Sequence, residues 1–208
     1  MNEEEIQRIF ADPENQRRVN VWYQREVDYT EQALYKQLGE KQPYIKEIFD
    51  STKSQTGIEN RNNLKVMRDT LEILLGLQTL ESTLTILVRK AQEIVDRCIP
   101  EIDRFYLALI AQTKSLEREY GKTMEEIVKE EQYRDEIYRR IFPTREEAEM
   151  YMVLSHELAK GVIGIEKVLN KNQKTTESER EEEMKLEFLK AIRGYKRKEF
   201  DRIYDIYN

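Results

Sequence analysis

From residue 66 to residue 98 the chain reads VMRDTLEILLGLQTLESTLTILVRKAQEIVDRC. Apolar or small residues recur along this stretch at spacings that alternate between four and three. This is the a and d pattern of a heptad repeat, which packs one helix against another. The residues concerned are Val66, Thr70, Ile73, Leu77, Leu80, Leu84, Leu87, Ala91, Ile94 and Cys98. The pattern predicts one long central helix over residues 58–98, roughly 60 Å in length at about 1.5 Å per residue.

A second apolar stripe widens the buried surface of this predicted helix. It runs through Met67, Leu71, Leu74 and Leu75. A helix that is apolar on two faces is normally surrounded by neighbouring helices. The sequence therefore predicts an all-α fold, an elongated antiparallel helical bundle around the central helix with coiled-coil-like packing.

The flanking sequence contains clear signals for the ends of other helices. Asp12-Pro13 is a cap residue followed by proline at the first helical position, which predicts a helix from there to about residue 38. Two capping boxes, Thr123 with Glu126 and Thr144 with Glu147, start further helices. Pro100 is expected to break or bend the central helix. The remaining predicted helices cover residues 43–49, 101–121, 123–142, 144–169 and 176–207, and the polar middle of 123–142 places that helix on the outside.

A polar stretch of small residues divides the chain unequally. Residues 51–57 read STKSQTG and are predicted to form a flexible joint. On this interpretation residues 1–50 form an N-terminal helical arm and residues 58–208 form the helical bundle. With only 7 Gly and 4 Pro in 208 residues, the chain lacks the turn residues that a β-rich fold requires.

Composition narrows the class of protein. Charged residues make up 37% and apolar residues 39%, which fits long helices with charged solvent faces. The net charge of −6 weighs against nonspecific binding to nucleic acid or to anionic membranes. The most apolar window, residues 71–88, contains Glu72 and Glu81, so a buried helix is favoured over a membrane span. An acidic N-terminus and a single cysteine predict a cytoplasmic protein, or an intracellular one in a host if the chain is viral.

Residues that could support chemistry are few. Cys98 falls on the apolar stripe, which predicts a buried and inert thiol. His156 is the only histidine, and residues 153 and 160, where a second ligand would stand, are Val153 and Lys160. The sequence therefore predicts no catalytic residue, metal or cofactor.

Two carboxylate pairs have the spacing of a known magnesium site. All-α nucleotide pyrophosphohydrolases bind Mg²⁺ through Glu-x-x-Glu pairs, and Glu146 with Glu149 and Glu179 with Glu182 have that spacing. An acidic helical chain produces such pairs by chance. A Mg²⁺-dependent nucleotide hydrolase is therefore only the third functional hypothesis.

Two helix faces provide the leading functional hypotheses. The first hypothesis is a non-enzymatic structural or interaction protein that binds a protein partner or forms a homo-oligomer, with a dimer favoured. Its predicted contact residues are Ile73, Leu77, Leu80, Leu84 and Leu87. The alternative is a nucleic-acid-associated regulatory factor that uses the basic C-terminal helix. The predicted contacts there are Lys190, Arg193, Lys196, Arg197, Lys198 and Arg202, with Tyr195, Phe200 and Tyr204 interleaved for base stacking. The competing interpretation of the second face is an ordinary solvated helix surface.

Overall fold

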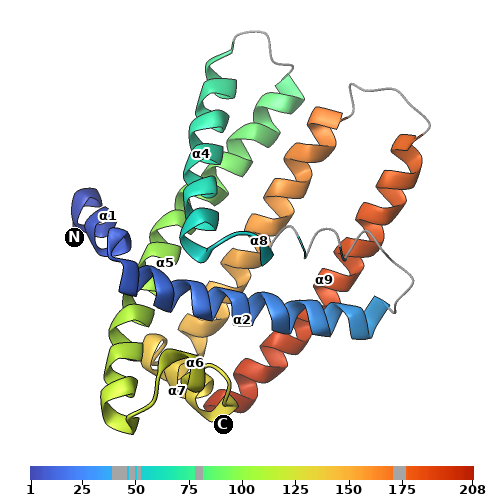
Figure 1. Ribbon diagram of the computed structural model, residues 1–208. Coiled ribbons are helices and arrows are strands. Elements are labelled where there is room, and N and C mark those ends of the chain that lie inside the picture. The colour runs from blue at the N-terminus through green and yellow to red at the C-terminus, as the bar shows by residue number, and fades with distance from the viewer. Residues whose placement is uncertain (39–45, 47–49, 51–52, 78–81, 171–176) are drawn as a thin grey trace.

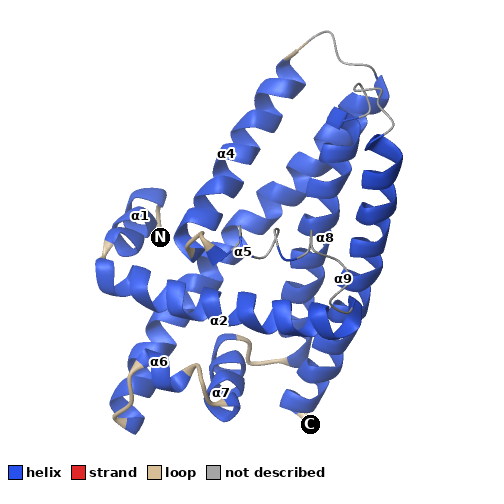
Figure 2. Ribbon diagram, turned by 45° about the vertical axis from the view of Figure 1, so that its right-hand side comes forward, coloured by secondary structure: helices blue, strands red, loops and turns tan. Residues whose placement is uncertain are grey.

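The computed structural model describes residues 1–38, 46, 50, 53–77, 82–170 and 177–208, except for the side chains of 82, 83, 156, 159–170, 177–189, 191 and 192. The secondary structure of the described residues is helical (Figure 2), so the all-α prediction is confirmed. The helices are α1 (Glu3–Ala11), α2 (Pro13–Leu38), α4 (Gly57–Gly76), α5 (Ser82–Tyr120), α6 (Met124–Ile127), α7 (Glu131–Ile141), α8 (Arg145–Asn170) and α9 (Glu177–Tyr207). Within the described part of the chain, none of them is long and apolar enough to cross a membrane.

Four long helices lie side by side and a fifth crosses them. In Figure 1 the order across the molecule is α4, α5, α8 and α9, and each helix packs against the next. Helix α2 runs across this layer and contacts α4, α5 and α9. The short helices α6 and α7 pack at the end of the layer where α5 ends. The architecture is therefore a layer of helices crossed by α2, rather than a bundle that surrounds one rod.

The prediction of a single helix over residues 58–98 is wrong. Helix α4 ends at Gly76, and Leu77 caps it in an extended conformation with φ −78° and ψ 118°. The chain then reverses, and α5 descends beside α4 from Ser82 (Figure 1). Glycine inside a helix is about 1 kcal/mol less favourable than alanine, which favours a helix end at Gly76. The reversal of the chain also lets Leu64 and Leu71 of α4 pack against the Val88 side of α5. Further along, Pro100 does not end α5, which continues to Tyr120.

The main core is built around aromatic rings from several helices. Phe105 of α5 stacks on Phe142 and on Tyr151 of α8, with ring centroids 5.9 and 5.0 Å away. Trp22 of α2 lies 6.2 Å from Phe105 and 5.6 Å from Tyr138 of α7. Aromatic rings bury large areas, and their edge and offset contacts add stabilisation beyond area alone. Part of the high tyrosine content is thus explained by the core.

The N-terminal helices belong to this core. Phe10 of α1 and Val19 and Trp22 of α2 are buried in the same cluster as Leu109 of α5 and Ile203 of α9. Residues 51 and 52 of the predicted joint lie outside the described residues. The predicted boundary there remains a prediction, but the segments on its two sides share one hydrophobic core.

Helix starts follow the predicted caps, with one internal break that the sequence did not reveal. Asp12 Oδ1 accepts from the backbone N–H of Glu14 at 2.8 Å, as its place before Pro13 predicts. The predicted helix 123–142 is instead two helices, α6 and α7, and their inner side chains enter the core. Its polar middle contains Arg134, which is buried and donates to the carbonyl of Val128 at 2.8 Å. That carbonyl thereby has a partner where the helix stops, and Arg134 is buried, whereas Lys129, Glu131 and Gln132 of the polar middle are exposed.

Candidate interaction surface

The predicted heptad stripe of α4 faces solvent. We call Val66, Thr70, Ile73 and Leu77 the α4 outer stripe. The exposed fractions of its three large apolar residues are 63% for Val66, 68% for Ile73 and 50% for Leu77. The second apolar stripe, on the other side of the helix, packs on α5 through Met67, Leu71, Leu74 and Leu75. The sequence thus contained both stripes, and the one that resembles a coiled-coil seam has no partner among the described residues.

The rest of the predicted contact set is divided between core and surface. Leu84, the first described side chain of α5, is half-buried and packs on the core between α4 and α5. Leu87 is exposed, as is its neighbour Ile86. Leu80 lies outside the described residues. The structure therefore places Ile73, Leu77 and Leu87 at the surface of one hairpin, on or near the end where α4 passes into α5 (Figure 1).

A close approach between α2 and the start of α4 fixes how α4 is rotated. The Gly57 N–H donates to Asn20 Oδ1 at 3.0 Å. A Cβ added at Gly57 would lie 2.9 Å from Cγ1 of the buried Val19 and 3.1 Å from Cβ of Tyr23. Thr56 and Glu59 form a capping box at the same turn. This box has the T-x-x-E signature that marks a helix start, and it was missed in the sequence.

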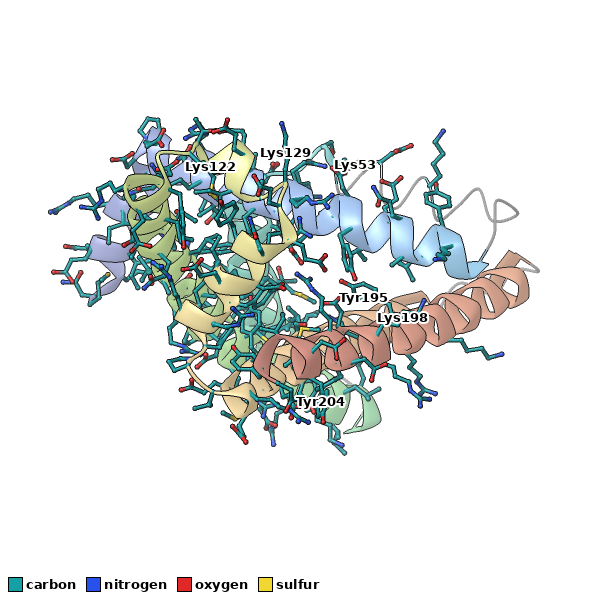
Figure 3. All side chains as sticks on the ribbon, turned by 90° about the horizontal axis from the view of Figure 1, so that it is seen from below. Lys53, Lys122, Lys129, Tyr195, Lys198 and Tyr204 are labelled. Atoms are coloured by element: carbon teal, nitrogen blue, oxygen red, sulfur yellow. The ribbon has the colours of Figure 1, made fainter. Side chains whose placement is uncertain are left out.

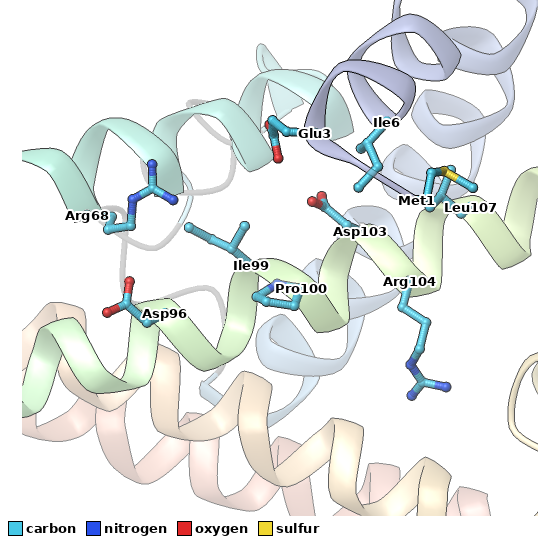
Figure 4. A pocket seen from close by; sticks show the side chains of 10 residues that line it. All are labelled: Met1, Glu3, Ile6, Arg68, Asp96, Ile99, Pro100, Asp103, Arg104 and Leu107. Carbon is cyan, nitrogen blue, oxygen red and sulfur yellow. The ribbon is translucent and has the colours of Figure 1, made fainter.

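A groove runs beside α4, between α1, α4 and α5. It encloses about 440 Å³, and its ten lining residues are shown in Figure 4. Apolar side chains such as Ile6, Ile99 and Leu107 lie beside charges of both signs, and Arg104 points away from it. None of the ten is a histidine, cysteine or serine. The groove forms one flank of the α4 surface.

The predicted basic face of α9 is divided between solvent and interior. Lys190, Arg193, Arg197 and Lys198 are exposed. Lys196 and Arg202 turn inward, towards α8 and towards α2 and α7, respectively. Tyr195 is buried, and its hydroxyl accepts from Thr30 Oγ1 at 3.1 Å between α9 and α2 (Figure 3). Tyr195 is therefore not positioned to stack on a base.

The inward side of α9 forms a polar cluster with α2, which we call the α2–α9 polar cluster: Glu26, Tyr29, Tyr195, Lys196, Glu199 and Arg202. The Arg202 guanidinium lies 5.4 Å from the ring centroid of Tyr29 and 5.6 Å from that of Tyr138. It also lies 3.9 Å from the carboxylate of the buried Glu199.

Burial changes the pKa values in this cluster. It raises the pKa of the Glu26 carboxyl to about 7, against an opposing effect from Arg202. Burial also raises the pKa of Glu199 and lowers that of Lys196. Desolvation of a charged form is the common cause.

The contact between Lys196 and Ser155 has the residue types of a serine–lysine dyad but the wrong hydrogen bonds. Lys196 Nζ donates to Ser155 Oγ at 3.1 Å, and Ser155 Oγ donates to the Met152 carbonyl at 3.2 Å. A nucleophilic serine would instead donate its proton to the base. The pair joins α9 to α8.

The other candidate chemical residues are placed as follows. Cys98 is buried, as predicted, and its thiol donates to the Leu154 carbonyl at 3.7 Å. Burial raises its pKa to about 11, so it is protonated at neutral pH. In the first carboxylate pair, Glu149 accepts from Arg145 at 2.7 Å. The side chains of His156, Glu179 and Glu182 lie outside the description, and the described residues contain no group of three His, Cys, Asp or Glu placed to hold a metal ion.

No protein-family model, curated protein or solved structure matches this chain. The role of each surface is therefore inferred from its own geometry and charge.

Proposed function

We propose that the chain is a non-enzymatic interaction protein that binds a macromolecular partner through the α4 outer stripe. The observation that carries this proposal is the exposure of Val66, Ile73 and Leu77 on one face of a helix whose opposite face is packed on α5. Exposed apolar side chains occur singly on many proteins, whereas a continuous stripe at helical spacing is typical of a binding face.

The size of the stripe sets how much of the hairpin a partner must cover. Full burial of a Val, Leu or Ile side chain contributes about 1.5–3 kcal/mol, and these three are already part-buried, so together they supply roughly 3–5 kcal/mol. Association costs about 4–15 kcal/mol in lost freedom of motion. The stripe alone supports only a weak complex. A stable one must also cover Ile86 and Leu87, which are 56% and 39% exposed, or add polar contacts.

Photo-crosslinking tests this proposal. With benzoylphenylalanine in place of Val66, we expect a discrete crosslinked product in extract of the source organism, because the partner covers that position. The product should disappear when Ile73→Ser and Leu77→Ser are added, since these changes remove the apolar contacts. The same crosslinker in place of Lys129, exposed after α6, is the control. Equal products at both positions, or a product that survives the serine changes, would contradict the proposal.

A second candidate function rests on the exposed basic residues of α9. Lys190, Arg193 and Arg197 are all exposed at spacings of three and four, so they share one face of the helix. We propose, as the alternative, that this face contacts the phosphates of a nucleic acid.

The triple change Lys190→Glu, Arg193→Glu and Arg197→Glu is expected to abolish RNA or DNA retardation at low salt. Three phosphate contacts predict that the logarithm of the binding constant falls with a slope of roughly −2 to −3 against the logarithm of salt concentration. Gel mobility measured across a salt series checks this, with Lys129→Glu as the control. Unchanged mobility of both nucleic acids with the unaltered protein would remove the alternative.

A further inference from the structure

The exposed face of α9 carries an aromatic ring as well as basic side chains. We call Lys190, Arg193 and Arg197 the α9 basic line. At 3.6 residues per turn, Tyr204 lies within about 40° of each of them around the helix axis, and roughly 10 Å beyond Arg197 along it. Tyr204 is 49% exposed, whereas Phe200 packs on the main core and Tyr195 is buried on the opposite side of α9 (Figure 3). Of the three aromatic residues predicted to stack on bases, Tyr204 is thus the one exposed beside the basic line.

The Tyr204 ring is held from the side of α8. The Arg145 guanidinium lies 4.6 Å from the centroid of this ring, and its Nε donates to Glu149 at 2.7 Å. A cation over an aromatic face is attracted to the ring, so this contact favours one orientation of the Tyr204 side chain. A side chain that is already ordered loses less freedom when a ligand binds to its exposed part. Tyr204 therefore presents an ordered aromatic surface next to the basic line.

The basic line is available to an anionic ligand. Within the described part of the chain, none of its three side chains forms an ion pair. Two exposed carboxylates of this part of α9, Asp201 and Asp205, lie towards the flank turned away from α8, as does Lys198. The basic residues outnumber these carboxylates, so the face has a net positive charge although the whole chain carries −6.

From this arrangement we infer that the nucleic acid bound by α9 is single-stranded, with phosphates on the α9 basic line and one base stacked on Tyr204. The inference rests on the second candidate function, and it names the substrate class of that face. It is independent of the α4 outer stripe, which lies at the other edge of the layer of helices (Figure 1).

The choice of a single strand follows from the position of the ring. In a duplex the bases are stacked on one another, so a ring on an exposed helix meets only the backbone or the base edges. An unpaired base can turn its face onto an aromatic side chain, and such stacking tolerates any sequence because every base has a π-face. A duplex would therefore use the basic line alone, whereas a single strand uses the basic line and Tyr204.

Fluorescence anisotropy with two labelled oligonucleotides tests the inference. The full chain would be titrated at low salt onto a single strand of about 12 deoxythymidines, a length within the range of known single-strand sites, and onto a hairpin duplex with the same number of phosphates. We expect the single strand to bind severalfold more tightly. Tyr204→Ala should lower the affinity for the single strand about tenfold and change the affinity for the duplex little, because it removes only the stacked base. Tyr204→Phe keeps the ring and should bind both oligonucleotides like the unaltered chain.

The salt dependence separates stacking from charge. Three phosphate contacts to a single strand give a slope of about −2 for the logarithm of the binding constant against the logarithm of salt concentration. Tyr204→Ala should leave this slope unchanged, whereas Arg197→Gln should reduce its magnitude by about 0.7. Tyr120→Ala is the matched control, since Tyr120 is 45% exposed at the end of α5, and it should bind like the unaltered chain. Thermal unfolding of each variant shows that the fold is retained.

The outcomes separate this inference from the second candidate function. Equal affinity for the two oligonucleotides, or equal effects of Tyr204→Ala and Tyr120→Ala, would overturn the single-strand inference. If the triple glutamate variant of the basic line still lost binding in that case, the phosphate contacts would stand without base stacking. If neither oligonucleotide bound to the unaltered chain at low salt, both the inference and the second candidate function would be refuted.

Discussion

Arg61→Met is expected to lower the free energy of unfolding by about 3–5 kcal/mol, because it leaves Asp103 buried and without its partner. The Arg61 side chain has no exposed surface, and its Nη2 donates to Asp103 Oδ2 at 3.0 Å while Nε donates to Oδ1. Its guanidinium also lies 4.8 Å from the ring centroid of Phe10. One side chain thus connects α4 to α5 and to α1. Urea unfolding followed by the fluorescence of Trp22, the only tryptophan, measures the change.

Two further variants separate the loss of the ion pair from the loss of packing. The double change Arg61→Met with Asp103→Leu should recover most of the stability, since well-packed apolar residues often replace a buried ion pair at little cost. Arg97→Met removes an exposed pair with Glu157 and should cost about 1 kcal/mol or less. A loss below about 1 kcal/mol for Arg61→Met itself would show that Asp103 finds solvent or another partner.

Glu26→Gln is expected to raise the free energy of unfolding by about 1–3 kcal/mol at pH 8 and to change it little at pH 5. Burial holds the pKa of Glu26 near 7, above its ordinary 4.5. Between these two values the folded chain keeps a proton that the unfolded chain releases. The stability contributed by Glu26 is therefore complete below about pH 4.5 and is lost as the pH rises through about 7. Each unit of pKa difference is worth about 1.4 kcal/mol, and glutamine stands in for the protonated form at all pH values.

Thermal or urea unfolding at several pH values between 5 and 8 gives this result directly. Glu4→Gln, on the exposed side of α1, is the control and should follow the unaltered chain within about 0.5 kcal/mol. If Glu26→Gln instead destabilised the chain at pH 8, attraction between the Glu26 carboxylate and Arg202 would outweigh the cost of burying it.

Features encoded by neighbouring residues were predictable from the sequence. The cap at Asp12, the capping boxes at Thr123 and Thr144 and the end of α5 before Gly121 all lie within a few residues of their partners. Gly121 has a φ of 63°, a conformation that glycine adopts without strain. Such signals need no knowledge of the tertiary structure.

The break between α4 and α5 was hidden by its spacing. Leu77 and Leu84 are seven residues apart, so a reversal of the chain between them leaves the heptad count intact. The sequence also contained two apolar stripes on α4 and could not say which one packs on a neighbour. That choice depends on the contact of Gly57 with α2, across 37 residues of chain.

The positions of the charged residues were predicted least well, because these positions also depend on contacts between residues that are distant in sequence. Arg61 and Asp103 are separated by 42 positions, and no local pattern joins them. Lys196 and Arg202 were predicted beside Arg193 on a basic face, but α9 packs against α2, α7 and α8 and turns these two inward. Which side of an amphipathic basic helix meets the core is decided by partners distant in sequence.

The shared core also determines when the chain can fold during its synthesis. Phe10 and Trp22 leave the ribosome long before Ile203, which belongs to the same buried cluster. Until then the aromatic face of α2 lacks part of its cover, and exposed apolar surface of this kind favours aggregation or chaperone binding. The hairpin of α4 and α5 closes locally through Leu71 and Val88. It can therefore form on the nascent chain before the main core is complete.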